Sequence, residues 1–318
     1  MSESQAQTIG GRASTPTAAG PNSAGGTSSA SPTIALLNQL PNPDRPALAR
    51  ARAVEAYAAL ADCHLCAHHC GVNRLAGELG LCRAGYATRC FSAQVESGDE
   101  LELIPTFAIA LSGCDLRCDF CITGAASWNP LAGEPVAPAR LAQRAIFALA
   151  RGARSVMFLG GEPTIHLPAA LEIVAALPPS AKLVWKTNAH GSAPARDWLA
   201  GLFDVWLADY KFGNDACAQR LAKIADYTSV VRENLLWAAQ RSELIVRHLL
   251  MPGHLECCWR PVARWLAREL PLTKVSLRSG YWPAWHAARH SELGSTVGVA
   301  ESRRAAEWAA ELGLRLIP

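Results

Sequence analysis

The amino-acid sequence predicts an α/β fold in which a parallel β-sheet, covered by helices, curves into a partial (β/α)6 barrel. Two observations carry this prediction. From about residue 104, short apolar runs alternate with longer amphipathic segments, as expected of successive βα units. The chemically unusual residues stand directly after the apolar runs, and in parallel barrels functional residues gather at the carboxyl ends of the strands.

The chain begins with a part that has too few large apolar side chains to form a core. Residues 1–44 are dominated by small and polar residues and proline, which predicts a disordered, low-complexity tail. Residues 45–61 have the pattern of a helix, and the stretch after them is rich in cysteine. We therefore expect three parts: the tail at 1–44, a helix with a cysteine-rich N-terminal segment at 45–100, and the barrel at 101–318.

Six apolar runs are the predicted strands. They cover residues 106–113, 155–161, 182–188, 204–211, 244–253 and 274–282. Helical patterns lie between them at 137–151, 167–177, 194–201, 215–241 with a break, and 260–270, and a last helix is expected at 301–312.

The composition limits the class of protein. Half of the 318 residues are apolar, enough for a sizeable core. The net charge of +3 is small and the basic residues are scattered, which argues against binding to nucleic acid or to an anionic membrane. The sequence has no run of about 18 or more apolar residues and no block pattern of a secretion signal, so we expect a cytoplasmic protein.

The eleven cysteines are bunched in short clusters with histidines nearby. This pattern is typical of metal ligation in a reducing compartment, with disulfides as the alternative. In the segment GCDLRCDFC, Cys114, Cys118 and Cys121 are spaced C-x3-C-x2-C. Three thiolates can hold three irons of a 4Fe-4S cluster and leave the fourth iron open. A structural zinc site or buried thiols are the alternative.

The segment FLGGEP follows the second predicted strand. Gly160 and Gly161 lack a Cβ and so allow the backbone to approach a ligand closely. The carboxylate of Glu162 can accept hydrogen bonds from an ammonium group. The cysteine spacing, the aromatic Phe120 before the last cysteine and this Gly-Gly-Glu-Pro segment together resemble the radical S-adenosylmethionine (SAM) enzymes.

The resemblance implies a radical SAM barrel with a 4Fe-4S cluster and SAM as cofactors. In that family the open iron binds the amino and carboxylate groups of SAM, and an electron cleaves the sulfonium to a 5'-deoxyadenosyl radical, which abstracts hydrogen from a substrate. By this resemblance the three cysteines ligate the cluster, the Gly-Gly-Glu segment contacts SAM, and Phe120 packs against the adenine. An ordinary core aromatic is the alternative for Phe120.

Three further segments, KTNAH, LADYKFG and VRHLLMPG, are similar to strand ends of glycyl-radical-enzyme activating enzymes. The similarity suggests Asn188, Asp209, Lys211 and Arg247 as further SAM contacts, and a guanidinium such as that of Arg247 suits recognition of a carboxylate. An ion pair of Asp209 with Arg247 or Lys211 is the alternative. Lys186 stands where activating enzymes usually carry aspartate.

The N-terminal segment holds a second set of cysteines, Cys63, Cys66, Cys70 and Cys82, spaced C-x2-C-x3-C-x11-C. Four thiolates can close a second 4Fe-4S cluster or a zinc site, and buried or redox-active thiols are the alternative. Cys257 and Cys258 are adjacent, so their side chains diverge if the segment is extended. We expect at most one of these two to face a site and core packing to be their role.

Residues 60–316 as a whole resemble a subgroup of iron-sulfur proteins related to pyruvate formate-lyase activating enzyme. The resemblance implies a radical SAM enzyme that binds SAM and acts on an unknown protein or small molecule. It also implies an electron donor such as flavodoxin or ferredoxin. Installation of a glycyl radical on a partner protein is one variant. A non-catalytic iron-sulfur or zinc protein, an electron carrier or scaffold on a degenerate barrel, is the alternative from a different class.

Overall fold

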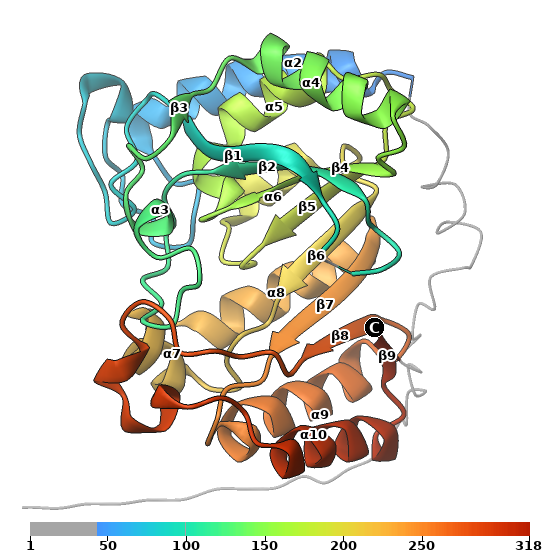
Figure 1. Cartoon of the computed structure of the whole chain (residues 1–318). Coiled ribbons are helices and arrows are strands. Elements are labelled where there is room, and N and C mark those ends of the chain that lie inside the picture. The colour runs from blue at the N-terminus through green and yellow to red at the C-terminus, as the bar shows by residue number, and fades with distance from the viewer. Residues whose placement is uncertain (1–42, 99) are drawn as a thin grey trace, which may run out of the picture. The chain divides into compact units, whose positions relative to one another are not determined.

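The computed structural model describes residues 43–98 and 100–318, which fall in one compact unit. Within these residues, the strands form an open sheet in the order β3-β1-β2-β4-β5-β6-β7-β8-β9 (Figure 1). They are β1 (Arg89–Glu96), β2 (Thr106–Leu111), β3 (Glu134–Pro135), β4 (Ser155–Gly160), β5 (Leu183–Thr187), β6 (Val205–Asp209), β7 (Glu243–Leu249), β8 (Lys274–Arg278) and β9 (Arg315–Ile317). Neighbours from β2 to β9 are parallel, whereas β1 is antiparallel to β2 and β3.

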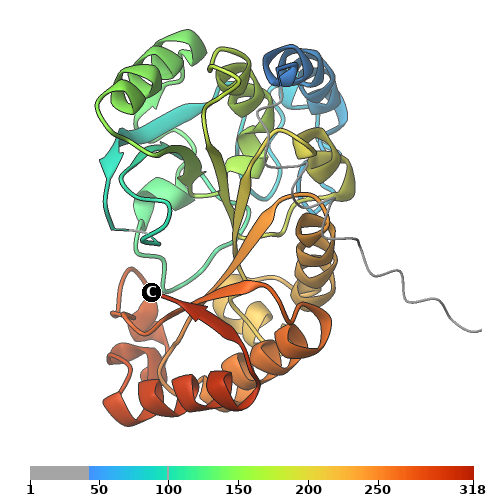
Figure 2. The same ribbon diagram turned by 90° about the vertical axis from the view of Figure 1, so that its right-hand side faces the viewer.

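Most of the described helices lie between parallel strands and cover the outer face of the sheet, whereas the first precedes the strands and the second lies in the loop after β2. They are α2 (Arg45–Ala58), α3 (Ala125–Trp128), α4 (Pro138–Ala150), α5 (Leu167–Ala175), α6 (Ala193–Leu199), α7 (Asp215–Ala222), α8 (Tyr227–Ala239), α9 (Arg260–Glu269) and α10 (Val299–Glu311). In Figure 1, α2, α4 and α5 lie together over β1, β2 and β4, and α9 and α10 lie together beside β8 and β9. Figure 2 shows the same arrangement from the side.

The two faces of the parallel sheet have different contents. Outward-facing residues such as Phe158 and Trp185 belong to the large core between the sheet and the helices. A smaller inner cluster, which includes Met157, Val184 and Leu207, fills the barrel near the amino ends of the strands. Because successive residues of a strand alternate between faces, the inward-facing positions beyond this cluster lie at the carboxyl ends of the strands, where the sequence turns polar.

The structure confirms the α/β fold with a parallel sheet, and each of the six predicted strands is present. The break in the helical pattern at 215–241 is the turn between α7 and α8. Three strands were missed: β1, β3 and β9. β1 is half-exposed, so it lacks the continuous apolar pattern of a strand buried on both faces, and β3 and β9 have only two and three residues.

The division into a segment at 45–100 and a barrel at 101–318 stays a prediction, although β1 of the first part pairs with β2 of the second along most of its length. The predicted disordered tail at 1–44 lies outside the described residues, except for its last two positions. In the described part of the chain, the helices are too short or too polar to cross a membrane.

Candidate functional site

A cavity of about 550 Å³ opens at the carboxyl ends of the parallel strands. Each residue that the sequence predicts at the cluster or at SAM lies on its wall. These residues are Cys114, Cys118, Phe120, Cys121, Gly160, Gly161, Glu162, Asn188, Asp209, Lys211 and Arg247. They come from the ends of five neighbouring parallel strands, and the pairing of these strands in one sheet brings them together.

The three cysteines lie in the loop that follows β2. Cys114 and Cys118 are buried, and Cys121 is partly exposed. The loop is fixed to the end of α7, because the backbone N–H groups of Arg117 and Asp119 donate to the carbonyls of Ala222 and Leu221 (3.1 and 2.9 Å). The sulfurs are therefore held on a rigid support at the edge of the cavity.

The surroundings of the cysteines test whether they fit a metal cluster. Burial raises the pKa of the Cys114 thiol well above its usual value, and burial raises the pKa of Cys118 to about 12 against the opposing charge of Lys211. Thiols of this kind stay protonated unless cations bind them. Two groups of three or more His, Cys, Asp or Glu side chains in the described residues have all their ligand atoms within 4.8 Å of one another. Neither group includes Cys114, Cys118 or Cys121, whose sulfurs lie farther apart. Their spacing and shared cavity suit a body larger than one ion.

Glu162 is almost completely buried beside Cys114 and joins the ends of β4 and β5. Its Oε1 accepts hydrogen bonds from the Thr164 N–H (3.1 Å), the Thr164 hydroxyl (2.6 Å) and the Thr187 hydroxyl (2.8 Å), and its Oε2 accepts one from the Asn188 N–H (2.7 Å). Burial, and then the charge of Asp115, raises the pKa of Glu162 to about 7. Three of these donors bond Oε1 and only one bonds Oε2, and each carboxylate oxygen has two lone-pair sites, so Oε2 can still accept a hydrogen bond from an ammonium group.

The two glycines before Glu162 are required by the sheet itself. A Cβ on Gly160 would lie 2.1 Å from the Leu111 carbonyl oxygen, and a Cβ on Gly161 would lie 1.8 Å from that of Gly113. The sequence argument attributed these glycines to the approach of a ligand. The structure gives a different reason, the close packing of the β4 end against the β2 end, although both glycines also line the cavity.

Asp115 is the center of a buried polar network that the sequence argument missed. Its carboxylate accepts hydrogen bonds from the Asn188 side-chain amide (2.7 Å) and pairs with His190 Nδ1 (3.0 Å). His68 contacts the Asp115 carbonyl oxygen through Nε2 (3.0 Å). Burial acts to raise the pKa of Asp115, but the hydrogen bonds and charge of His190 and the Asn188 amide outweigh it, and the pKa is lowered. This network joins the N-terminal segment to the cysteine loop.

The sequence signal for the network was weak. Asp115 follows the first cysteine of the triad and His190 stands two residues after Asn188, but neither position has a distinctive spacing. The direct contact of the Asn188 amide with Asp115 also means that Asn188 orients the loop of Cys114, in addition to lining the cavity.

Charged side chains form the opposite wall of the cavity. Asp209 pairs with Lys211, and Arg247 Nε lies 3.8 Å from Asp209 Oδ1. Arg247 also lies 3.8 Å from Glu100, which accepts a hydrogen bond from the Ser276 hydroxyl (2.8 Å). The ion pairs that the sequence argument weighed as an alternative are therefore present.

The same ion pairs control the charge on this wall. Burial acts to raise the pKa of Asp209, but Lys211 and Arg247 outweigh it, so the pKa lies below the usual range. Burial acts to lower the pKa of Lys211, and the Asp209 carboxylate reverses this. The basic side chains of Lys186, Lys211 and Arg247 line the cavity beside the Asp209 carboxylate, and such a wall suits an anionic group of a ligand.

Aromatic side chains close the remaining side. Phe120 is buried and packs edge-on against Phe212 (ring centroids 6.0 Å apart) and tilted against Tyr281 (6.5 Å). Phe120 therefore belongs to the core and also lines the cavity. Tyr281 and Trp282 line the cavity too, whereas Trp285 packs against Trp128 (5.8 Å).

The four N-terminal cysteines are also brought together. Cys63, Cys66, Cys70 and Cys82 line one small cavity of about 10 Å³ beneath Arg74. This free volume is about that needed to hold one water-sized species. In the described structure, no three of these four sulfurs lie within 4.8 Å of one another. Both predicted occupants, a second cluster or zinc, stay proposals.

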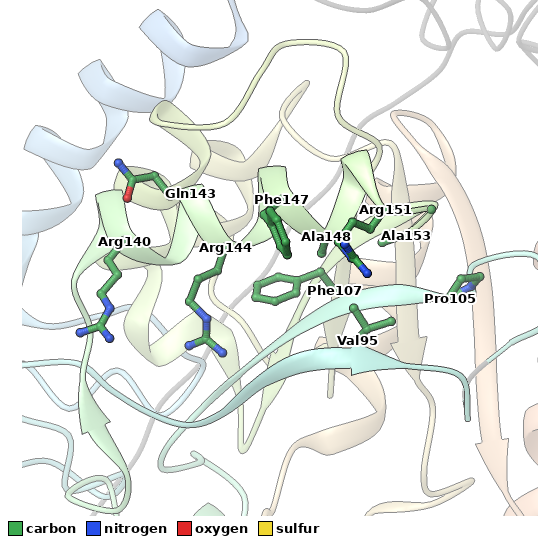
Figure 3. Close-up of a pocket in the computed structure, with 11 residues that line it drawn as sticks. Val95, Pro105, Phe107, Arg140, Gln143, Arg144, Phe147, Ala148, Arg151 and Ala153 are labelled. Atoms are coloured by element: carbon green, nitrogen blue, oxygen red, sulfur yellow. The ribbon is translucent and has the colours of Figure 1, made fainter.

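A separate cavity of about 650 Å³ lies between α4 and the strands β1 and β2 (Figure 3). Figure 3 shows Arg144 of α4 beside the ring of Phe107, with Arg140 farther along α4 and away from the rings of Phe107 and Phe147. The described residues that line it include no cysteine, histidine or acidic residue and none of the predicted site residues. The candidate site for chemistry is therefore the cavity at the strand ends.

The chain is similar to known proteins in sequence and fold. Residues 109–266 match the family model of the Radical SAM superfamily. The uncharacterized protein MJ0674 of Methanocaldococcus jannaschii is 31% identical over 270 residues, which are 80% of this chain and 76% of that protein.

Solved structures with a similar fold have low sequence identity to this chain. Streptococcus suis SuiB bound to the precursor peptide SuiA is 16% identical with a TM-score of 0.51, over 64% of this chain and 46% of SuiB. This chain thus spans less than half of SuiB. A domain of pyruvate-formate lyase-activating enzyme from Bacteroides vulgatus is 18% identical with a TM-score of 0.42, over 51% of this chain and 96% of that domain.

Proposed function

The chain belongs to the radical SAM superfamily, and from this premise we propose that it is an enzyme in which Cys114, Cys118 and Cys121 hold a 4Fe-4S cluster. Such a cluster, when bound, passes one electron to SAM and yields methionine and a 5'-deoxyadenosyl radical that abstracts hydrogen from a substrate. The observation that carries the proposal is the single cavity on which the three cysteines and eight predicted SAM contacts meet.

The described residues have distinct roles in this proposal. The loop after β2 presents the three thiols, and its hydrogen bonds to the end of α7 keep them in place. Asn188 and His190 hold Asp115 of the loop from the other side. Glu162 fixes the end of β4 next to that of β5 and keeps a carboxylate within reach of an ammonium group.

The charged wall is the proposed site for the SAM carboxylate. Arg247 and Lys211 face the cavity, and both are paired with Asp209. At 3.8 Å the contact of Arg247 with Asp209 is too long for a hydrogen bond. A guanidinium and an ammonium group on one wall suit the carboxylate of a ligand, which a guanidinium can bind through two parallel hydrogen bonds.

The substrate and the electron donor belong to the same proposal. The reaction needs a one-electron reductant, and we propose a flavodoxin or a ferredoxin in that role. Trp282 is 62% exposed at the rim of the cavity and offers an apolar contact to a substrate. An activating-type enzyme would take the hydrogen from a glycine of a partner polypeptide, and a small-molecule substrate is the other outcome of a substrate search.

We further propose that Cys63, Cys66, Cys70 and Cys82 bind a second group, either a 4Fe-4S cluster or zinc. The support is their common small cavity and the burial of Cys66 and Cys82, with Cys63 and Cys70 partly exposed. Iron analysis separates the occupants: two clusters require about eight irons per chain, whereas one cluster with zinc requires about four. Cys66→Ser should remove the second group and leave the first.

The experiment that tests the main proposal is electron paramagnetic resonance of the reduced, anaerobically reconstituted protein with and without SAM, together with an assay for 5'-deoxyadenosine. We expect a 4Fe-4S signal that changes on addition of SAM, and formation of 5'-deoxyadenosine. Cys118→Ala should lose both, and Cys90→Ala, which changes a buried cysteine outside all of these sites, should keep both. A signal that ignores SAM, or normal cleavage by Cys118→Ala, would support a non-catalytic iron-sulfur protein or a different ligand set.

A further inference from the structure

A third group of potential metal ligands lies between α7 and the turn that follows β7. The ligand atoms of Cys217, His254, Cys257 and Cys258 all lie within 4.8 Å of one another. The Cys217 and Cys257 sulfurs are 3.8 Å apart, and those of Cys257 and Cys258 are 4.0 Å apart. His254 Nδ1 lies 3.3 Å from the Cys257 sulfur and 3.4 Å from the Cys258 sulfur. We call this set the Cys3His group.

These separations match a tetrahedral metal ion. Zinc binds sulfur at about 2.3 Å and histidine nitrogen at about 2.0 Å, so a tetrahedron places two sulfurs about 3.8 Å apart and a sulfur and a nitrogen about 3.5 Å apart. A disulfide would need sulfurs at about 2.05 Å, and each of these cysteines is free. The side chains therefore already stand at the corners of a site for one ion.

The backbone has special geometry where it places these ligands. Leu255–Trp259 forms a π-helical turn, and such turns are frequent at functional sites. The turn brings the sulfurs of both adjacent cysteines to one point, where an extended segment would separate them. Cys258 belongs to the core and Cys257 packs against it, as the sequence argument expected. Gly213 permits the approach of the other side, because a Cβ there would lie 2.4 Å from the Cys258 carbonyl oxygen.

Hydrogen-bond donors surround the sulfurs. Asn214 caps α7 by accepting a hydrogen bond from the Cys217 N–H (2.8 Å), and its side-chain amide lies 3.3 Å from the Cys217 sulfur and 2.7 Å from the Cys257 carbonyl oxygen. The Gly213 N–H donates to the Cys258 sulfur. Donors of this kind support sulfur that carries negative charge, as it does on a metal.

The other nitrogen of His254 has a carboxylate nearby. His254 Nε2 lies 3.5 Å from Glu292 Oε1 and 3.1 Å from Arg220 Nη2. With Nδ1 on a metal, Nε2 carries the proton and donates toward Glu292, the arrangement that commonly orients a metal-bound histidine. The Arg220 contact is then no longer a hydrogen bond and lengthens, while Arg220 keeps its own bond to Glu292 (2.5 Å).

We propose that the Cys3His group binds one zinc ion in a closed, structural site. Four protein ligands complete a tetrahedron and leave no position for a substrate, and Cys3His is a ligand set of structural zinc. His254, Cys258 and Cys217 are buried and Cys257 is partly exposed, so the ligand atoms are largely shielded from water. The site goes beyond the proposed radical chemistry and does not depend on it.

The zinc site also explains how the cluster loop is supported. The ion would join α7, which carries Cys217, to the turn after β7. The end of α7 accepts the backbone hydrogen bonds of Arg117 and Asp119 in the loop of the three cluster cysteines. Loss of zinc should therefore loosen that loop in addition to lowering the stability of the chain.

The test is metal analysis of the full chain, isolated anaerobically, by mass spectrometry. We expect about one zinc per chain that survives Cys118→Ala and Cys66→Ser. Cys217→Ser and Cys257→Ser should lose it, whereas Cys90→Ser should keep it as the matched control. His254→Cys should also keep it, because four cysteines bind zinc as well; this variant separates loss of a ligand from a failure to fold.

A second measurement uses cobalt in place of zinc. Protein produced with Co²⁺ should show the absorption bands of tetrahedral cobalt bound to thiolate, and Cys217→Ser should reduce them strongly. If the zinc found in wild type is lost from Cys66→Ser and kept in Cys217→Ser, the ion is bound by the N-terminal cysteines and the proposal is overturned. Iron bound by the Cys3His group, seen as iron that Cys217→Ser removes, would overturn the proposal as well. A disulfide between Cys217 and Cys257 in the isolated protein would also overturn it.

Discussion

At the scale of single residues, two buried carboxylates beside Cys114 have opposite electrostatic fates. Asp115 has a lowered pKa and is hydrogen-bonded to His190 and Asn188, whereas Glu162 has a raised pKa and is hydrogen-bonded to hydroxyl and backbone N–H groups. The negative charge of Asp115 also raises the pKa of Glu162, because a nearby like charge disfavours the ionised carboxylate. Asp115 therefore stays ionised next to the cysteines, whereas Glu162 can gain or lose a proton near neutral pH.

Replacement of Glu162 by alanine should affect both stability and binding. It leaves the N–H groups of Thr164 and Asn188 and the Thr187 hydroxyl without their acceptor, and each buried unpaired donor costs about 1–3 kcal/mol. We expect the free energy of unfolding in urea to fall by about 3 kcal/mol or more, SAM binding to weaken, and the iron content to be kept. Glu134→Ala, at an exposed position of β3, is the control.

Asp119 should make stability depend on pH. It accepts hydrogen bonds from His290 Nε2 (2.8 Å) and Lys223 Nζ (3.1 Å). Burial acts to raise the pKa of Asp119, but these partners outweigh it, and the pKa lies below its usual value. A depressed carboxyl pKa contributes stability above the unfolded value, and this contribution is lost as the pH falls through the folded value.

The matching variant is Asp119→Asn in the metal-free protein. We expect it to lower the unfolding free energy by about 1–3 kcal/mol at pH 7, with the difference from wild type shrinking only below about pH 4. Urea unfolding at several pH values measures this. A difference that stays constant down to pH 3 would show that Asp119 acts through packing alone.

At the scale of elements, the carboxyl ends of neighbouring strands are tied directly to one another. The Gly161 N–H donates to the Leu111 carbonyl and the Glu162 N–H to the Gly113 carbonyl, each at 2.9 Å. The end of β4 thus lies against the end of β2, just before the cysteine loop. The position of that loop depends on two elements that are far apart along the chain.

Gly161→Ala should break this contact. The added Cβ would lie 1.8 Å from the Gly113 carbonyl oxygen, a backbone atom that cannot rotate away. We expect a loss of about 1–3 kcal/mol in unfolding free energy and a lower iron content after reconstitution, because Cys114 directly follows Gly113. Gly294→Ala, where a Cβ meets no atom within 4 Å, is the control and should leave both values unchanged.

At the scale of the whole molecule, the eleven cysteines resolve into sets of different kinds. Three face the large cavity, four line the small N-terminal cavity, three join His254, and Cys90 stands apart from all of them. The chain thus has three separate groups of cysteines, one of them in the loop after β2. The N-terminal segment contacts this loop through His68 and Asp115, and α7, which carries Cys217, contacts it through the backbone of Arg117 and Asp119.

SAM should stabilise the whole molecule only when the cluster is present. A ligand at 100 times its Kd raises the unfolding free energy by about 2.7 kcal/mol. We expect SAM to raise the melting temperature of the reconstituted protein by several degrees and to leave Cys118→Ala unchanged, measured by differential scanning calorimetry. An equal shift in Cys118→Ala would mean that SAM binds without the open iron.

The sequence by itself determined the elements and the cluster loop. The apolar runs and the spacing C-x3-C-x2-C are local patterns, and local patterns survive without knowledge of the fold. They were enough for the six parallel strands and for the expectation that Asn188, Asp209 and Arg247 lie together at strand ends.

Only the tertiary structure decided the partners of these residues. The pairing of Asp115 with His190, the reason for Gly161, and the meeting of Cys217 with His254 and Cys258 all join segments that are distant along the chain. Such contacts follow from how helices and strands pack, and packing leaves no periodic trace in the sequence. The π-helical turn at Leu255–Trp259 is the clearest case, since it turns two adjacent cysteines toward the same point where an extended segment would separate them.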